Sequence, residues 1–88
     1  MNWVVNLSSD AAKQLRRLPP DRQDQISRAI DELTQDPLGG DVKAIKGGKF
    51  QGALRRRVGR YRIIFALDGV NRQVQIGAIL LRNESTYR

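Results

Sequence analysis

The sequence predicts a small α+β domain, in which an N-terminal helical hairpin packs on one face of a twisted antiparallel sheet. The chain has 88 residues, of which 40% are hydrophobic, and this fits a single domain spanning residues 1–88 with one modest core. Apolar residues in the first part of the chain recur with a period near 3.6, which is typical of amphipathic helices. After residue 41 the period falls to 2, which indicates strands. The expected order of elements is β-α-α-β-β-β-β.

The first part of the chain predicts one strand and two helices. Residues 2–7, NWVVNL, are rich in strand-forming residues, and the SSD that follows is a helix N-cap signal. Ala11, Leu15 and Leu18 form one helical stripe, and the prolines at 19 and 20 end that helix. A second helix begins near Pro20 or Asp21 and ends at the DPLGGD segment. Its apolar face consists of Ile26, Ala29, Ile30 and Leu33.

The second part of the chain predicts four strands joined by short turns. The expected strands are residues 42–46, 53–58, 60–67 and 72–81, with DGVN at 68–71 as a hairpin turn and 82–88 as a polar tail. Consecutive strands joined by such turns favour an antiparallel sheet with the helices on one side.

Alternation along these strands predicts which side chains face the helices. In 60–67 the apolar set is Tyr61, Ile63, Phe65 and Leu67, which leaves Arg62 on the open face. Arg55 and Arg57 are expected to join Arg62 there. Val74, Ile76, Ala78 and Leu80 are expected to share one face of the last strand. Small residues beside the arginines would leave room for a ligand, namely Ala53, Ala66 and Gly77.

The charge of the chain indicates a polyanionic partner. There are 16 Lys and Arg residues against 9 Asp and Glu, a net charge of +7, and no acid occurs between Lys43 and Arg62. Such a bias favours nucleic acid, an acidic protein or a membrane surface, and guanidinium groups bind phosphate in bidentate fashion. The alternative is a solvated sheet face on which arginine stems cover apolar area.

The absence of histidine and cysteine excludes several kinds of chemistry. No histidine-dependent ribonuclease mechanism, Ser-His-Asp triad or Cys-His pair can be built. Neither a metal site nor a cofactor is expected, because the acids lie mainly on helix surfaces or in turns. The sequence shows no signal pattern and no membrane-spanning stretch, so we expect a soluble protein without membrane contact, and a cytoplasmic location fits the lack of cysteine.

Tyr, Lys, Arg and Glu84 remain for acid–base work. Arg82 and Tyr87 lie five residues apart, directly after the last expected strand. Nearby cations favour the phenolate form of a tyrosine, which could then accept the proton of a ribose 2′-hydroxyl while arginines stabilise charge on the phosphate. Packing of Tyr87 on the sheet edge, or stacking on a base, is the structural alternative.

Several motifs resemble those of RelE-type toxins of the RelE/ParE toxin–antitoxin superfamily. They are LSSDAAKQLRRLPP near the start, LTQDP, IKGG, RVGRYRIIF and the closing LLRNESTYR, so the resemblance runs over nearly the full length. It implies a metal-independent, ribosome-dependent endoribonuclease that cleaves mRNA in the A site by 2′-hydroxyl attack. By position, Arg62 resembles the arginine that stabilises the transition state, Arg82 the one that assists the leaving group, and Tyr87 the general base.

The resemblance also implies a basic strand that grips mRNA and ribosomal RNA. The expected RNA-binding residues are Lys46, Lys49, Arg55, Arg57 and Arg60. The best-studied members carry two lysines where this chain has Ala53 and Arg55, and the chain is one residue shorter between Arg82 and Tyr87. Lys46 or Lys49 would compensate in space for the missing lysine.

Three functions remain open from the sequence. The first is the ribosome-dependent mRNA interferase, with Tyr87, Lys46 or Glu84 as the group that moves the proton. The second is a ParE-like inhibitor of DNA gyrase, and the third is a non-catalytic RNA-binding homologue. Each implies a cognate acidic antitoxin, RelB-like for the first, and a net charge of +7 would speed that association.

Overall fold

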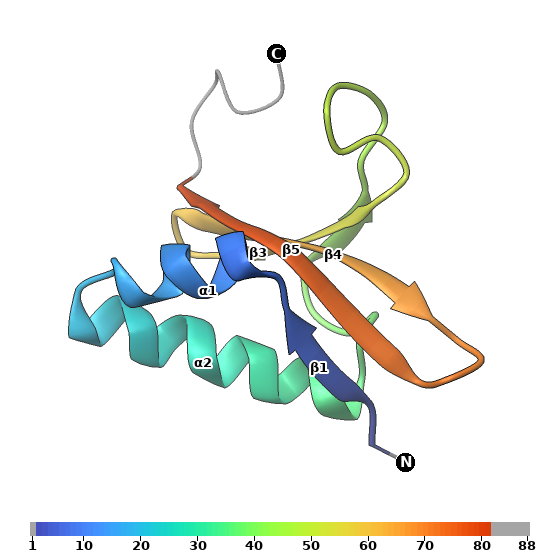
Figure 1. Cartoon of the computed structure of the whole chain (residues 1–88), viewed down its shortest axis with the longest axis horizontal. Coiled ribbons are helices and arrows are strands. Elements are labelled where there is room, and N and C mark those ends of the chain that lie inside the picture. The colour runs from blue at the N-terminus through green and yellow to red at the C-terminus, as the bar shows by residue number, and fades with distance from the viewer. Residues whose placement is uncertain (1, 82–88) are drawn as a thin grey trace.

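The computed structural model describes residues 2–81, which form two helices and five strands in the expected order. The elements are β1 (Val4–Leu7), α1 (Ser9–Arg16), α2 (Pro20–Gln35), β2 (Val42–Ala44), β3 (Leu54–Val58), β4 (Tyr61–Asp68) and β5 (Gln73–Leu81). The predicted α+β class is confirmed, and both helices lie on one side of the sheet (Figure 1). Within residues 2–81, no helix is long and apolar enough to cross a membrane.

The sheet has the strand order β1-β5-β4-β3-β2. The four later strands pair antiparallel, as predicted, but β1 runs parallel to β5 in the register Val5↔Val74, so the sheet is mixed. The reason is the route of the chain: the two helices carry it from β1 at one edge to β2 at the other. The three hairpin steps that follow return it to β1, with β5 running in the same direction.

Both helices start at residues that favour a helix N-terminus, and α2 buries its apolar face against the sheet. The Ser8 side chain accepts a hydrogen bond from Ala11 N at 3.0 Å and so caps α1, while Pro20 occupies the first turn of α2. Along α2, the buried residues Ile26, Ala29 and Leu33 form the predicted apolar face. This face packs against the sheet in a core that includes Ile63, Phe65, Val74, Ile76 and Ile79.

A bulge at Gly77 changes the face of every later side chain on β5. Phe65 pairs with Ile76 but Ile64 pairs with Ala78, so Gly77 is an extra residue. The prediction that Val74, Ile76, Ala78 and Leu80 share one face is therefore wrong. Val74 and Ile76 face the helices, whereas Ala78 and Leu80 pair with Ile64 and Arg62 on the open face.

Helix α1 supplies the hydrogen bonds that fix this bulge. The Ser8 hydroxyl donates to the carbonyl of Gly77 at 2.8 Å, and the Gln14 side-chain oxygen accepts from Ile79 N at 2.6 Å. Backbone groups that leave the regular ladder at a bulge need such partners. The start of α1 and the middle of β5 are thus fastened together although they are far apart in sequence.

Candidate functional site

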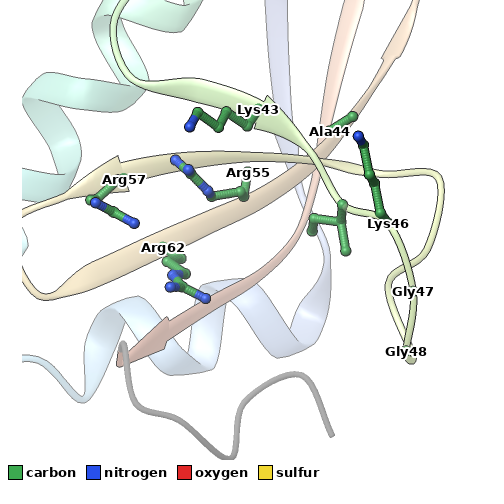
Figure 2. A pocket seen from close by; sticks show the side chains of 9 residues that line it. Lys43, Ala44, Lys46, Gly47, Gly48, Arg55, Arg57 and Arg62 are labelled. Carbon is green, nitrogen blue, oxygen red and sulfur yellow. The ribbon is translucent and has the colours of Figure 1, made fainter.

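A cleft of about 420 Å³ lies on the face of the sheet opposite the helices (Figure 2). It is bounded by β2, β3 and β4 and by the start of the loop that joins β2 to β3. Its lining consists of Lys43, Ala44, Ile45, Lys46, Gly47, Gly48, Arg55, Arg57 and Arg62. Five of these nine residues are basic and none is acidic, so the cleft is suited to an anion.

Strand alternation and register bring the three arginines together. Arg55 and Arg57 are two residues apart on β3, so they point to the same face, and Arg57 lies directly opposite Arg62 of β4. Figure 2 shows the three side chains leaving β3 and β4 toward the same side of the sheet. Lys43 pairs with Arg55 from β2 and adds a fourth cation to this group. The expectation that Arg55, Arg57 and Arg62 share the uncovered face is confirmed.

The intervening arginine faces the other way. Arg56 forms an ion pair with Glu32 of α2 and donates to the carbonyl of Gly39 at 3.4 Å. Its side chain is only 12% exposed, and the carboxylate of Glu32 compensates its charge on the helix side. Arg56 therefore serves the packing of α2 on the sheet, and the cleft receives the arginines on either side of it.

Asp41 is a charged neighbour of the cleft that the sequence analysis does not single out. Its Oδ1 lies 3.0 Å from Nη1 of Arg55, and its Oδ2 lies 3.8 Å from Nε of Arg57. The hydrogen bond from Arg55 and the charges of Arg55, Arg57 and Lys43 lower the pKa of Asp41 below its usual value. Its position directly before an expected strand is visible in the sequence, but the pairing of that strand with β3 is not.

Small residues line the cleft, but they are not the ones that were expected. None of Ala53, Ala66 and Gly77 lines it, whereas Gly47 and Gly48 do. Gly48 has a φ of 74°, a conformation that L side chains rarely adopt, so the loop can turn here at little cost. A ligand in the cleft would meet bare backbone on this side.

The predicted RNA-binding residues divide into two groups. Lys46, Arg55 and Arg57 line the cleft together with Arg62, but Lys49 and Arg60 do not. The amine of Lys49 instead lies 5.6 Å from the centre of the Phe50 ring. Arg60 is exposed in the turn between β3 and β4. Three further candidates lie outside the described residues, namely Arg82, Glu84 and Tyr87.

The cleft residues themselves define the chemistry that is possible there. Arginine stays protonated in proteins, so Arg55, Arg57 and Arg62 can bind and stabilise negative charge but cannot accept a proton. Paired guanidinium groups at a phosphate stabilise a transition state in which charge builds on the phosphoryl oxygens. Residues 2–81 contain no group of three or more side chains that could hold a metal ion.

Comparison with solved structures finds the same fold in complexes of RelE-type proteins. The chain matches the toxin–antitoxin complex RelBE2 of Mycobacterium tuberculosis with a TM-score of 0.81 and 24% identity, covering 93% of this chain and 100% of the other. It matches the archaeal RelE–RelB complex of Pyrococcus horikoshii with a TM-score of 0.81 and 23% identity, covering 97% and 100%.

The RelB–RelE antitoxin–toxin complex of Methanococcus jannaschii gives a TM-score of 0.65 and 26% identity, covering 85% of this chain and 87% of the other. No protein-family model matches the chain, and no curated protein matches it significantly. The resemblance to RelE-type toxins that the sequence motifs indicated is thus confirmed by three-dimensional structure. The chain has the fold of the RelE-type toxins.

Proposed function

We propose that this protein is the toxin of a type II toxin–antitoxin system and acts as a ribosome-dependent mRNA endoribonuclease. The observation that carries the proposal is the convergence of Arg55, Arg57 and Arg62, with Lys43 and Lys46, on one open cleft in a RelE-type fold. Guanidinium groups from two strands at one site match the geometry of a phosphodiester.

In this proposal the nucleophile belongs to the RNA. The ribose 2′-oxygen attacks the adjacent phosphorus, the bond from phosphorus to the 5′-oxygen breaks, and the products carry a 2′,3′-cyclic phosphate and a 5′-hydroxyl. Arg62 stabilises the charge that builds on the phosphoryl oxygens. Arg55, Arg57 and Lys46 hold the RNA backbone. The exposed residues Lys49 and Arg60 contact RNA outside the cleft.

The residues that move protons in this proposal are taken from the sequence motif. Tyr87 takes the 2′-hydroxyl proton and Arg82 assists the departing 5′-oxygen, with Lys46 and Glu84 as alternative bases. Of these four residues only Lys46 lies within the described part of the chain, where it lines the cleft. Attack by the 2′-hydroxyl would limit cleavage to RNA, because DNA lacks this group.

The proposed partners follow from the same surface. The neighbours from M. tuberculosis, P. horikoshii and M. jannaschii were each solved in complex with an antitoxin. We infer that an acidic, RelB-like antitoxin binds this chain and neutralises its net charge of +7. The other partners are mRNA and ribosomal RNA in the A site, which places the protein in the cytoplasm.

Primer extension on a reporter transcript tests the proposal. After induction of the protein, new 5′ ends should appear within the translated region, in register with the reading frame. Purified protein should cut the same message in translating ribosomes and cut it little as naked RNA. Blocked supercoiling by DNA gyrase with an intact transcript would instead support the ParE-like alternative. Binding of RNA without either effect would support a non-catalytic homologue.

A further inference from the structure

We propose that Asp41 is a positioning residue, which fixes the guanidinium of Arg55 at the wall of the cleft so that it faces the bound phosphate. The inference deepens the proposed function and rests on it for the identity of the anion as an RNA phosphate. Asp41 itself does not line the cleft, whereas Arg55 does. Asp41 therefore acts on a ligand through Arg55.

The contacts of Asp41 fix both the position and the plane of this guanidinium. Nη1 of Arg55 donates to the Asp41 carboxylate at 3.0 Å and to the Asp41 carbonyl oxygen at 3.2 Å. The same carbonyl accepts a hydrogen bond from the backbone N of Arg57 at 3.0 Å. The acceptor is thus attached to β3, the strand that carries Arg55, and two acceptors on one nitrogen restrict rotation of the side chain.

Burial explains why Arg55 needs this partner. Its side chain is 11% exposed, while the side chain of Asp41 is 48% exposed. A cation this deeply buried requires a compensating charge. Both contacts begin at Nη1, and a guanidinium has five N–H donors in a planar fork. Asp41 therefore engages one nitrogen of the group and leaves its remaining N–H donors for a ligand in the cleft that Arg55 lines.

Asp41 has two opposite effects on the site: its charge weakens the attraction for RNA, and its contacts order the Arg55 side chain. Its carboxylate lies close to Arg55 and Arg57, so it lowers the positive potential that attracts RNA. Removal of this carboxylate makes the site more positive by one unit but frees the Arg55 side chain. RNA should then bind as well as before or more tightly, while cleavage slows because an ordered donor is lost from the transition state.

Single-turnover cleavage on programmed ribosomes separates these two effects. We expect Asp41→Ala to lower the rate at saturating protein by up to about 100-fold, because the donor is misplaced, without raising the protein concentration needed for half-saturation. Asp41→Asn keeps an acceptor oxygen for Arg55 and should recover part of the rate. Asp68→Asn is the matched control, because it removes the same charge from the end of β4, away from the cleft lining. A wild-type rate for Asp41→Ala, or a parallel loss of rate, binding and folded protein, would overturn the proposal.

Nitrogen-15 NMR of the arginine side chains provides a test that does not require activity. The Arg55 guanidinium should give resolved, slowly exchanging N–H signals in the wild type, which are lost in Asp41→Ala and persist in Asp68→Asn. If those signals are the same in Asp41→Ala and the wild type, positioning by Asp41 is wrong. If the signals depend on Asp41 while the wild type cleaves no message, positioning of Arg55 stands and the proposed nuclease function fails.

Discussion

Arg57 of β3 and Arg62 of β4 are cross-strand partners, so two cations lie side by side on the open face of the sheet. Like charges in this arrangement lower the stability of a sheet. On the next strand, Leu80 is the cross-strand partner of Arg62 and forms an apolar boundary to the cationic group. An anion that contacts both guanidinium groups would relieve their repulsion, and this leads to the first prediction.

Phosphate should raise the melting temperature of the protein relative to chloride at equal ionic strength. A ligand that binds only the folded state stabilises it by mass action. The difference should shrink in Arg57→Gln, which removes one of the opposed cations. Calorimetry measures the melting temperatures. Arg60→Gln is the control, since Arg60 is exposed and lies outside the cleft lining. An equal phosphate effect in both variants would contradict an anion site between Arg57 and Arg62.

Replacement of Arg62 by alanine should abolish growth inhibition and lower mRNA cleavage by about 100- to 1,000-fold, as expected for loss of a charge-stabilising donor. Arg28→Ala removes the same type of side chain from the exposed surface of α2, outside the cleft lining, and should retain the activity. Induction assays and primer extension measure both effects, and circular dichroism shows whether each variant is folded. Inhibition by folded Arg62→Ala at the wild-type level would refute the assignment of Arg62.

Stability should fall in acid partly through Asp41 and Asp68. A hydrogen bond from Arg55 lowers the pKa of Asp41, and hydrogen bonds from Asn71 lower that of Asp68, in both cases below the usual value for an aspartate. A carboxyl whose pKa is depressed by folding stabilises the protein above its unfolded-state pKa, and this contribution is lost as the pH falls through the folded-state value. Urea unfolding between pH 2 and pH 5 should show a shallower acid decline in Asp41→Asn. A decline identical to that of the wild type would exclude a contribution from Asp41.

Ser8→Ala should destabilise the protein by about 1 to 2 kcal/mol. The substitution removes the N-cap of α1 and also the hydrogen bond to the Gly77 carbonyl. Ser9→Ala is the matched control, because Ser9 is an exposed residue in the first turn of the same helix and should change stability by less than about 0.5 kcal/mol. Chemical denaturation measures both. Equal effects of the two variants would show that the hydrogen bonds of the Ser8 side chain contribute little to the free energy of unfolding.

The sequence was most informative where structure depends on local patterns. Period-2 alternation correctly placed Arg62 opposite the helix face because the side-chain direction in a regular strand depends only on its neighbours. Alternation failed after Gly77, since the bulge there is held by Ser8 and Gln14, which are far away in the chain. The parallel pairing of β1 with β5 was missed for a similar reason, because the edge to which the chain returns is a property of the whole sheet.

The site was predicted less completely than the fold. Residue type and spacing correctly grouped Arg55, Arg57 and Arg62, because these residues lie on adjacent strands of one hairpin. Asp41 escaped notice because its contact with Arg55 depends on the register between β2 and β3, which the intervening glycine-rich loop does not reveal. Lys49 was expected to replace the missing lysine and Arg60 was included for its charge, and neither criterion shows which side chains a loop or turn directs into a cleft.

The placement of β5 between β1 and β4 has a consequence for synthesis of the protein. β1 has no strand neighbour until residues 73–76 have been made, so the sheet cannot be completed on a nascent chain that lacks its last strand. Pairings between such distant segments also form slowly compared with helices and hairpins. Translation must therefore run almost to the end of this sequence before the finished domain exists. During the time before β5 is made, the domain is incomplete, and an inhibitor can already be present when it is finished.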